Sequence, residues 1–235
     1  HLILANRVNR MGLQLLQMPS TWGLANPRMA LTDVGDLELV DLTSLAYPTQ
    51  GALLKRTLDL LLVIAAGLFL LPTMLILAFM IRLSDGGPAL FTQRRCGADG
   101  QPFEMYKFRS MVVNAEDMRE QLSDQNESEG VLFKIRDDPR VTPLGRHLRR
   151  WSLDELPQLL NVLRGDMNLV GPRPLPMADL EGMENDAELA YWFSQRCKVK
   201  PGITGTWQVS AREALKMSDM VRLDIDYIQN WSISG

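Results

Sequence analysis

The stretch from Trp151 to Pro176, WSLDELPQLLNVLRGDMNLVGPRPLP, contains the strongest local signals in the chain. Two adjacent carboxylates, Asp154 and Glu155, come directly before an apolar, helix-like segment that Gly165 follows. A glycine just past the last periodic residue is a typical end of a helix. The pattern predicts a helix from about Asp154 to Leu163, followed by a rigid turn at the proline-rich GPRPLP.

The acidic pair has two structural interpretations, both of which place it at the start of that helix. Ser152 and Glu155 lie three residues apart and match a capping box. Alternatively, Asp154 is itself the N-cap, and Pro157 then lies in the first turn, where its missing N–H costs nothing. A carboxylate in the first turn also stays ionised beside the positive end of the helix dipole, so a capping role and a chemical role are compatible.

The chemical interpretation depends on the basic residues that surround the pair. Basic side chains dominate the segment just upstream: Lys134, Arg136, Arg140, Arg146, Arg149 and Arg150. Arginines near a helix N-terminus favour a bound polyphosphate. An ionised carboxylate facing a phosphate can act as a nucleophile, provided that arginines and a divalent metal neutralise the charge. Magnesium suits hard oxygen ligands and commonly takes only one or two carboxylates.

The run from Leu60 to Ile81 contains no charged residue. At about 1.5 Å per residue, roughly 20 apolar residues can cross the ~30 Å hydrocarbon core of a bilayer, so we favour a membrane segment over a buried core helix. Pro72 lies inside the run and predicts a kink. The chain either spans the membrane as a kinked helix or enters and leaves on one face. Basic residues at both ends, Lys55, Arg56 and Arg82, do not decide between these two paths.

Composition limits the class of protein. The 235 residues are 46% hydrophobic and 23% charged, enough for a sizeable core, and the net charge of -3 argues against nucleic-acid binding. Cys96 and Cys197 lie far apart, so we expect neither a disulfide nor a zinc site, which suits a reducing compartment. The chain begins at His1 and stops at NWSISG, from which we expect a fragment cut at both ends.

The remaining patterns predict an α+β fold that is mainly helical and has a short β-hairpin. Residues 89–93 and 103–108 read as strands joined by a turn at 97–100. We expect a helix and then a mobile loop within 114–130, an acidic helix that includes 191–195, and a last helix at 218–231. Residues 1–50 are broken up by prolines and give no sign of catalysis.

Four segments together resemble the bacterial sugar transferases, the monotopic polyprenyl-phosphate phosphoglycosyl transferases. They are KRTLDLLLVIAAGLFLLP, YKFRSM, SLDELPQLLNVLRGDMNLVGPRP and KPGITGTWQVSAR, and the resemblance runs from about Leu54 to Trp231. It implies an enzyme that moves a sugar 1-phosphate from a UDP-sugar to polyprenyl phosphate, usually undecaprenyl phosphate. UMP leaves, in what would be the first membrane step of exopolysaccharide or glycan synthesis.

The resemblance also implies roles for particular residues. The family's acidic dyad falls on Asp154 and Glu155. Asp154 would attack the sugar-linked phosphate, hold the phospho-sugar covalently and bind Mg²⁺, and Glu155 would help to position the metal or the acceptor. The family's basic substrate contacts match Lys107, Arg149, Arg173 and Arg212.

The resemblance further implies an arrangement at the membrane. Residues 51–83 would form a re-entrant helical hairpin, kinked at Pro72, on the cytoplasmic face of the bacterial inner membrane. Residues 84–235 would be the cytoplasmic catalytic domain, truncated at its C-terminus, and residues 1–50 a remnant of the N-terminal domain and linker of a long-form member. The oligomeric state is left open, with a homo-oligomer among the alternatives.

Two rival functions come from other classes of protein. A membrane-anchored scaffold without catalysis would use Asp154 only as a cap and would tolerate Asp154→Asn, since asparagine caps as well as aspartate. A membrane phosphatase would use water as the acceptor and would not depend on polyprenyl phosphate. Neither rival explains a rigid GPRP turn beside a basic cluster and a re-entrant apolar segment.

Overall fold

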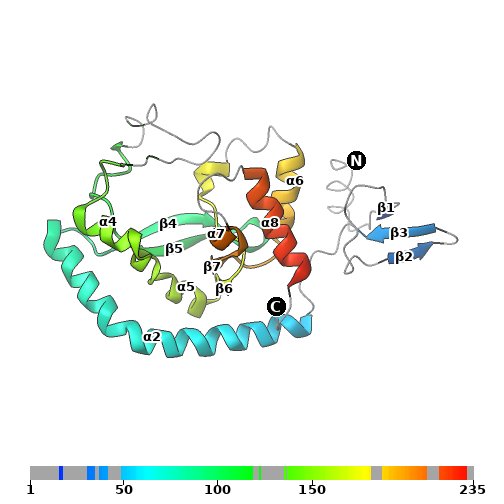
Figure 1. Cartoon of the computed structure of the whole chain (residues 1–235), viewed down its shortest axis with the longest axis horizontal. Helices are drawn as coiled ribbons and strands as arrows, with labels where there is room; N and C mark the ends of the chain where they lie inside the picture. The colour runs from blue at the N-terminus through cyan, green and yellow to red at the C-terminus, as the bar shows by residue number, and fades with distance from the viewer. Residues whose placement is uncertain are drawn as a thin grey trace.

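The computed structural model describes residues 16–17, 31–34, 37–41, 49–118, 122, 135, 137–180, 187–210 and 217–231. Helices and strands are mixed along the chain, as predicted (Figure 1). The α-helices are α2 (Thr49–Asp85), α4 (Pro143–Arg150), α5 (Gln158–Arg164), α6 (Ala187–Arg196), α7 (Thr206–Ser210) and α8 (Met217–Asn230). Short 3₁₀ turns are η1 (Ala98–Gly100), η3 (Leu153–Glu155) and η4 (Met177–Leu180). The strands are β1 (Leu16–Gln17), β2 (Leu31–Val34), β3 (Leu37–Asp41), β4 (Leu90–Cys96), β5 (Pro102–Phe108), β6 (Asn168–Val170) and β7 (Gly202–Thr204).

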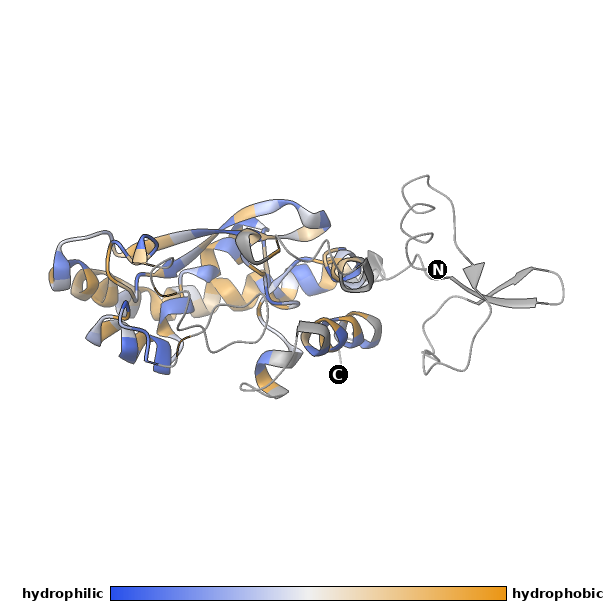
Figure 2. Cartoon of the chain, turned by 90° about the horizontal axis from the view of Figure 1, so that it is seen from above, coloured by the Kyte–Doolittle hydropathy of each residue, from blue (hydrophilic) through white to orange (hydrophobic). Residues whose placement is uncertain are grey.

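The apolar run forms α2, a continuous helix of 37 residues that passes through Pro72. Figure 1 shows it as one bent ribbon below the rest of the chain, and Figure 2 shows its largely apolar composition. Only 11% of the most apolar 18-residue stretch of this helix is buried against the rest of the protein. Leu68 and Phe69 are 72% and 83% exposed. Such exposure argues against a core helix and indicates a membrane-anchoring segment.

The N-terminal half of α2 is tied to the rest of the chain. Val63 is buried with Met105 of β5 and with Val162 and Met167 from α5 and the turn after it. Arg56 donates to the carbonyls of Val162 (2.7 Å) and Leu163 (3.2 Å), which lie in the last turn of α5. The helix therefore lies against α5 and β5.

The C-terminal half of α2 packs against the same structural unit. Ile81 is buried with Phe108 of β5 and Leu148 of α4. Both halves of α2 are therefore buried with residues of the same strand, β5.

The charged residues of α2 that precede the apolar run make specific contacts with the rest of the chain. Lys55 pairs with Asp59 at 3.4 Å, and both side chains are buried. Asp59 also accepts a hydrogen bond from the backbone N–H of Leu169 in β6. These groups fasten the helix to the residues near the predicted site, instead of acting only as charges at a membrane surface.

The predicted β-hairpin is confirmed, with longer strands than expected. β4 and β5 pair antiparallel from Leu90↔Phe108 to Cys96↔Pro102, and η1 makes the turn. The hairpin supplies Lys107 to the site. In the described part of 1–50, β1, β3 and β2 form a separate antiparallel sheet.

A parallel pair of strands, β6 and β7, was not predicted. It brings the GPRP turn beside the KPGITG segment, with Asn168 opposite Gly202 and Val170 opposite Thr204. The approach is so close that a Cβ on Gly202 would lie 2.1 Å from the backbone nitrogen of Gly171. Three-residue strands leave no periodic signal in a sequence, which explains the omission.

The C-terminal helices agree with the prediction. The helix that includes 191–195 is α6 and the last helix is α8, and they share a core of Val199, Val221, Ile225 and Ile228. Of the helix predicted within 114–130, the described part shows helical hydrogen bonds from Met118 N to Asn114 O and from Leu122 N to Met118 O. Most of the predicted loop lies outside the described residues.

The two cysteines, which are far apart in the sequence, lie close together in the structure. Cys96 ends β4 and Cys197 follows α6, and their sulfur atoms lie 3.7 Å apart as free thiols. Their separation of 101 residues gave no hint of this contact.

Candidate active site

Asp154 lies in η3, the short turn that joins α4 to α5. Ser152 before it has a left-handed backbone, with φ 54°, and makes no side-chain cap. The α-helix begins only after Pro157, which takes the N-cap position without a side-chain hydrogen bond. Both capping interpretations are therefore wrong, and Asp154 is 8% exposed without serving as a helix cap.

The surroundings of Asp154 also differ from the expected dipole-stabilised carboxylate. Burial raises the pKa of Asp154 above its ordinary value, and the neighbouring charge of Glu155 adds to this. The positive charges of Lys107 and Arg149 lower the pKa without cancelling the rise. Asp154 is thus a desolvated carboxyl facing two cations.

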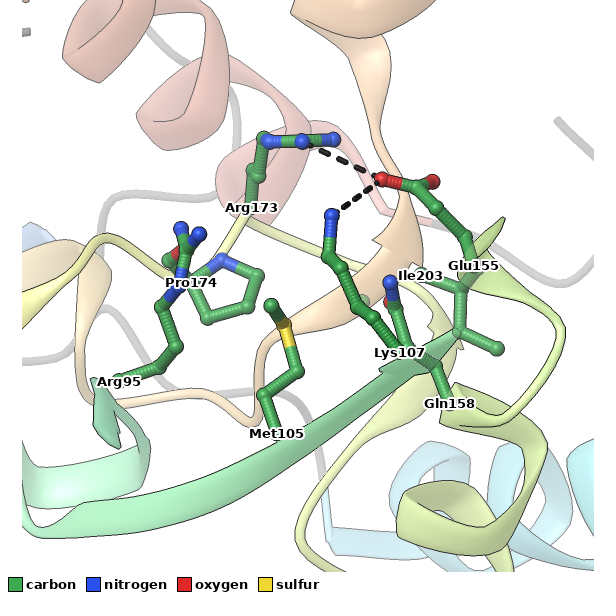
Figure 3. A pocket seen from close by; sticks show the side chains of 9 residues that line it. Arg95, Met105, Lys107, Glu155, Gln158, Arg173, Pro174 and Ile203 are labelled. Carbon is green, nitrogen blue, oxygen red and sulfur yellow. Dashed lines mark hydrogen bonds and ion pairs between the residues drawn. The ribbon is translucent and has the colours of Figure 1, made fainter. Parts of the chain in front are cut away.

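Glu155 meets the opposite balance. Its Oε1 accepts from Lys107 Nζ at 2.9 Å and from Arg173 Nη2 at 3.3 Å (Figure 3). Burial alone would raise the pKa of Glu155, but the charges of Lys107 and Arg173 outweigh it and lower the pKa. Neighbouring acids whose pKa values are pushed apart are typical of sites that assign them different tasks.

Lys107 reaches the site from β5. Burial lowers the pKa of Lys107, as does Arg173, against the opposing charges of Glu155 and Asp154. Its strand is held to α5 by Asn161, which is fully buried, accepts from Tyr106 N (3.0 Å) and donates to Glu104 O (2.7 Å). Asn161 was not found in the sequence, because its role depends on contacts between distant segments.

Arg149 comes from α4, the helix before the acidic pair. That helix begins at Pro143 and is capped by Thr142, whose Oγ1 accepts from Gly145 N at 2.9 Å. Arg149 Nε donates to Ser110 Oγ at 2.8 Å, and burial lowers its pKa while Asp154 and then Asp138 raise it. Arg149 therefore lies on the Asp154 side of the site.

A narrow pocket joins the residues from the hairpin, α5 and the GPRP turn (Figure 3). Its lining includes the predicted Lys107, Glu155 and Arg173. Arg95 and Gln158 also line it and were missed: Arg95 lies outside the quoted motifs, and Gln158 lies within one but carries no charge that would single it out. Arg212, the remaining predicted contact, lies outside the described residues.

The donor set for a metal can be judged from the same carboxyls. Among the described residues there is no group of three or more His, Cys, Asp or Glu side chains placed to hold a metal. Mg²⁺ needs only one or two carboxylates when substrate phosphates complete its ligands. The adjacent oxygen donors Asp154 and Glu155 fit that requirement.

The arrangement can stabilise a bound diphosphate and present a carboxylate to it. Lys107, Arg149 and Arg173 supply positive charge around the two acids. These groups come from β5, α4 and the GPRP turn. Val162 of α5 packs with Met105 of β5, and Leu148 of α4 is buried with Phe108 of the same strand.

Comparisons with known proteins identify the family of the chain. Residues 50–235 match the model of the family described as bacterial sugar transferase. The galactosyl transferase CpsE of Streptococcus agalactiae is 43% identical over 188 residues, which cover 80% of this chain and 40% of that protein. The exopolysaccharide production protein ExoY of Sinorhizobium fredii is 40% identical, over 78% of this chain and 80% of that protein. The undecaprenyl-phosphate galactose phosphotransferase of Salmonella typhimurium is 37% identical over 222 residues, which cover 92% of this chain and 45% of that protein. The chain thus spans less than half the length of several curated relatives.

Proposed function

Since this chain belongs to the bacterial sugar transferase family, we propose that it moves a sugar 1-phosphate from a UDP-sugar to polyprenyl phosphate. The observation that carries the proposal is the placement of Asp154, a buried carboxyl beside Glu155, which is itself held by Lys107 and Arg173. The names of relatives mention galactose, glucose and undecaprenyl phosphate, which makes these the first substrates to test.

In the first step, a carboxylate oxygen of Asp154 attacks the phosphorus that carries the sugar. The bond from that phosphorus to the bridging oxygen breaks, UMP leaves with the electron pair, and an acyl phosphate joins the sugar to Asp154. Lys107, Arg149 and Arg173 offset the negative charge that otherwise keeps a carboxylate from a diphosphate.

In the second step, a phosphate oxygen of the polyprenyl phosphate attacks the same phosphorus. The bond to the Asp154 oxygen breaks, which frees the carboxylate and leaves a polyprenyl diphosphate sugar. Mg²⁺ held by Asp154, with Glu155 next to it, would supply further charge neutralisation to both phosphates.

The path of α2 supports a place at one membrane face. Val63 and Ile81 lie 18 positions apart in the sequence, yet they are buried against Met105 and Phe108 of the same strand. A helix that crossed a bilayer would carry its two ends to opposite sides, whereas both halves of α2 pack against one folded unit. A re-entrant path, bent at Pro72, on the cytoplasmic face of the inner membrane fits these contacts.

A turnover assay tests the proposal. Purified protein in detergent is given Mg²⁺, undecaprenyl phosphate and a panel that begins with UDP-galactose and UDP-glucose. We expect UMP release that depends on the lipid and forms a lipid-linked sugar diphosphate. Repeated turnover without the lipid would indicate a phosphatase, and no turnover with any UDP-sugar would favour a scaffold.

A further inference from the structure

The GPRP turn is held from outside through its carbonyl groups. Pro172, Pro174 and Pro176 have no backbone N–H. Every second residue of this segment therefore cannot donate a backbone hydrogen bond. Successive carbonyls accept instead: Arg173 O from Arg196 Nη2 at 2.7 Å and Pro174 O from Arg95 Nη1 at 2.8 Å. Leu175 O then accepts from Cys96 N at 2.9 Å.

Arg196 is the support that acts on Arg173 directly. It ends α6, is 4% exposed, and forms an ion pair with Asp224 of α8 at 2.6 Å. Asp224 is itself 1% exposed. A buried charge pair is costly to desolvate, and its geometry fixes the guanidinium that holds the Arg173 carbonyl.

Arg95 is the second support, one carbonyl further along. It comes from β4, and its Nε donates to Gln93 Oε1 at 2.9 Å, which orients the guanidinium. An isolated bridge between Arg95 and Pro176 continues this edge. Arg95 also lines the pocket, so it approaches the substrate space more closely than Arg196 does.

We propose that Arg196 is a positioning residue that, fixed by Asp224, holds the Arg173 backbone so that the Arg173 guanidinium faces Glu155 and the donor diphosphate. This inference rests on the proposed function. Arg196 contributes to donor binding only through Arg173, and Arg95 supports the same turn at the next carbonyl, that of Pro174. The helices α6 and α8 thereby become part of the substrate site, although neither supplies a residue to the pocket lining.

A double-mutant cycle separates this role from a general effect on the fold. The full chain carrying Asp154→Asn, which blocks the covalent step, is used to measure the dissociation constant of UDP-galactose or UDP-glucose at equilibrium. Arg196→Lys keeps the charge opposite Asp224 but loses the planar fork. We expect it to weaken binding by roughly tenfold beside Arg173, and by no more than about twofold beside Arg173→Lys, since residues that act through each other are not additive.

Arg56→Lys is the matched control. Arg56 also donates hydrogen bonds to two backbone carbonyls, those of Val162 and Leu163, at the C-terminal end of α5. We expect it to lower the unfolding temperature about as much as Arg196→Lys does, while leaving the dissociation constant unchanged. If Arg196→Lys does not fold, Asp224→Asn is placed in the same cycle, because it removes the charge that fixes the Arg196 guanidinium.

The outcomes are distinct. The same loss of affinity from Arg196→Lys in both Arg173 backgrounds would overturn the positioning role and leave the proposed function intact. Failure of every variant, including Asp154→Asn alone, to bind any UDP-sugar would contradict the proposed function, and the positioning role with it.

Discussion

Asp154 and Glu155 are neighbours in sequence but experience different electrostatic environments. Asp154 is buried without an ion pair among the described residues, and its pKa is raised, mainly by that burial. Glu155 lies between Lys107 and Arg173, and its pKa is lowered. We infer that Glu155 organises the basic groups while Asp154 is left available to react.

The Asp154→Asn substitution should separate stability from activity. Because the folded protein raises the pKa of Asp154, it favours the protonated form, and wild-type stability falls as the pH rises through that pKa. The neutral amide removes this cost, so we expect an equal or higher unfolding temperature at neutral pH. The difference in unfolding temperature between the variant and the wild type should shrink as the pH is lowered. Thermal unfolding of both proteins at neutral and at acidic pH measures it. A clear loss of stability at neutral pH would contradict the assigned environment.

Glu155→Gln should behave in the opposite way. Since the pKa of Glu155 is lowered, its contribution to stability is present above the ordinary pKa of a glutamate and is lost as the pH falls through the lowered value. Removing the charge leaves Lys107 and Arg173 without their common partner. We expect a loss on the order of 2 kcal/mol in the free energy of unfolding, measured by denaturant at neutral pH. A free energy of unfolding equal to that of the wild type would show that the ion pairs of Glu155 with Lys107 and Arg173 do not stabilise the fold.

The residues that the sequence did and did not reveal differ in a physical way. Asp154, Glu155 and Arg173 lie in a contiguous motif, so their chemistry could be predicted before their geometry was known. The roles of Asn161 and Arg196 arise from contacts with backbone groups in distant segments, which no local pattern records. The capping hypothesis failed for a related reason, since the left-handed turn at Ser152 delays the helix until after Pro157.

At the scale of elements, periodicity predicted the long segments and missed the short ones. The apolar helix, the hairpin and α8 each extend over enough residues to show a pattern. β6 and β7 have only three residues each, and the two strands come from separate motifs of the sequence. That short pair nevertheless sets the GPRP turn beside the site.

The packing of β4 against the end of α6 can be tested through the two cysteines. The hydrogen bond from Cys197 is the main cause that lowers the pKa of Cys96 to about 7, against burial, which raises it, and the thiolate is the reactive form. We expect a small disulfide oxidant to be attacked by Cys96, after which Cys197 displaces the reagent and an intramolecular disulfide remains. Peptide mass spectrometry without reductant should find Cys96 joined to Cys197. The Cys197→Ser variant should stop at the mixed disulfide, and wild-type protein that does the same would contradict the 3.7 Å contact.

At the scale of the whole molecule, the path of α2 has a direct test. Leu53 is 75% exposed near the start of the helix, and Ser84 is exposed near its end, so a cysteine at either position should accept a reagent. With a re-entrant path, both positions should react from the cytoplasmic side of oriented membrane vesicles. Reaction of the native Cys96 and Cys197 is measured in the unsubstituted protein and subtracted. Labelling of the two positions from opposite sides would show that α2 spans the bilayer.

The covalent step is the central claim, and one measurement tests it most directly. Wild-type protein is given a UDP-sugar and Mg²⁺ without any lipid, and the digested chain is analysed by mass spectrometry. We predict a single release of UMP for each protein molecule and a sugar phosphate on the peptide that contains Asp154, because the acceptor that clears the acyl phosphate is absent. Asp154→Asn should carry no adduct, and undecaprenyl phosphate added afterwards should remove the sugar phosphate from the wild type. An adduct on another residue, or full turnover by Asp154→Asn, would contradict the account.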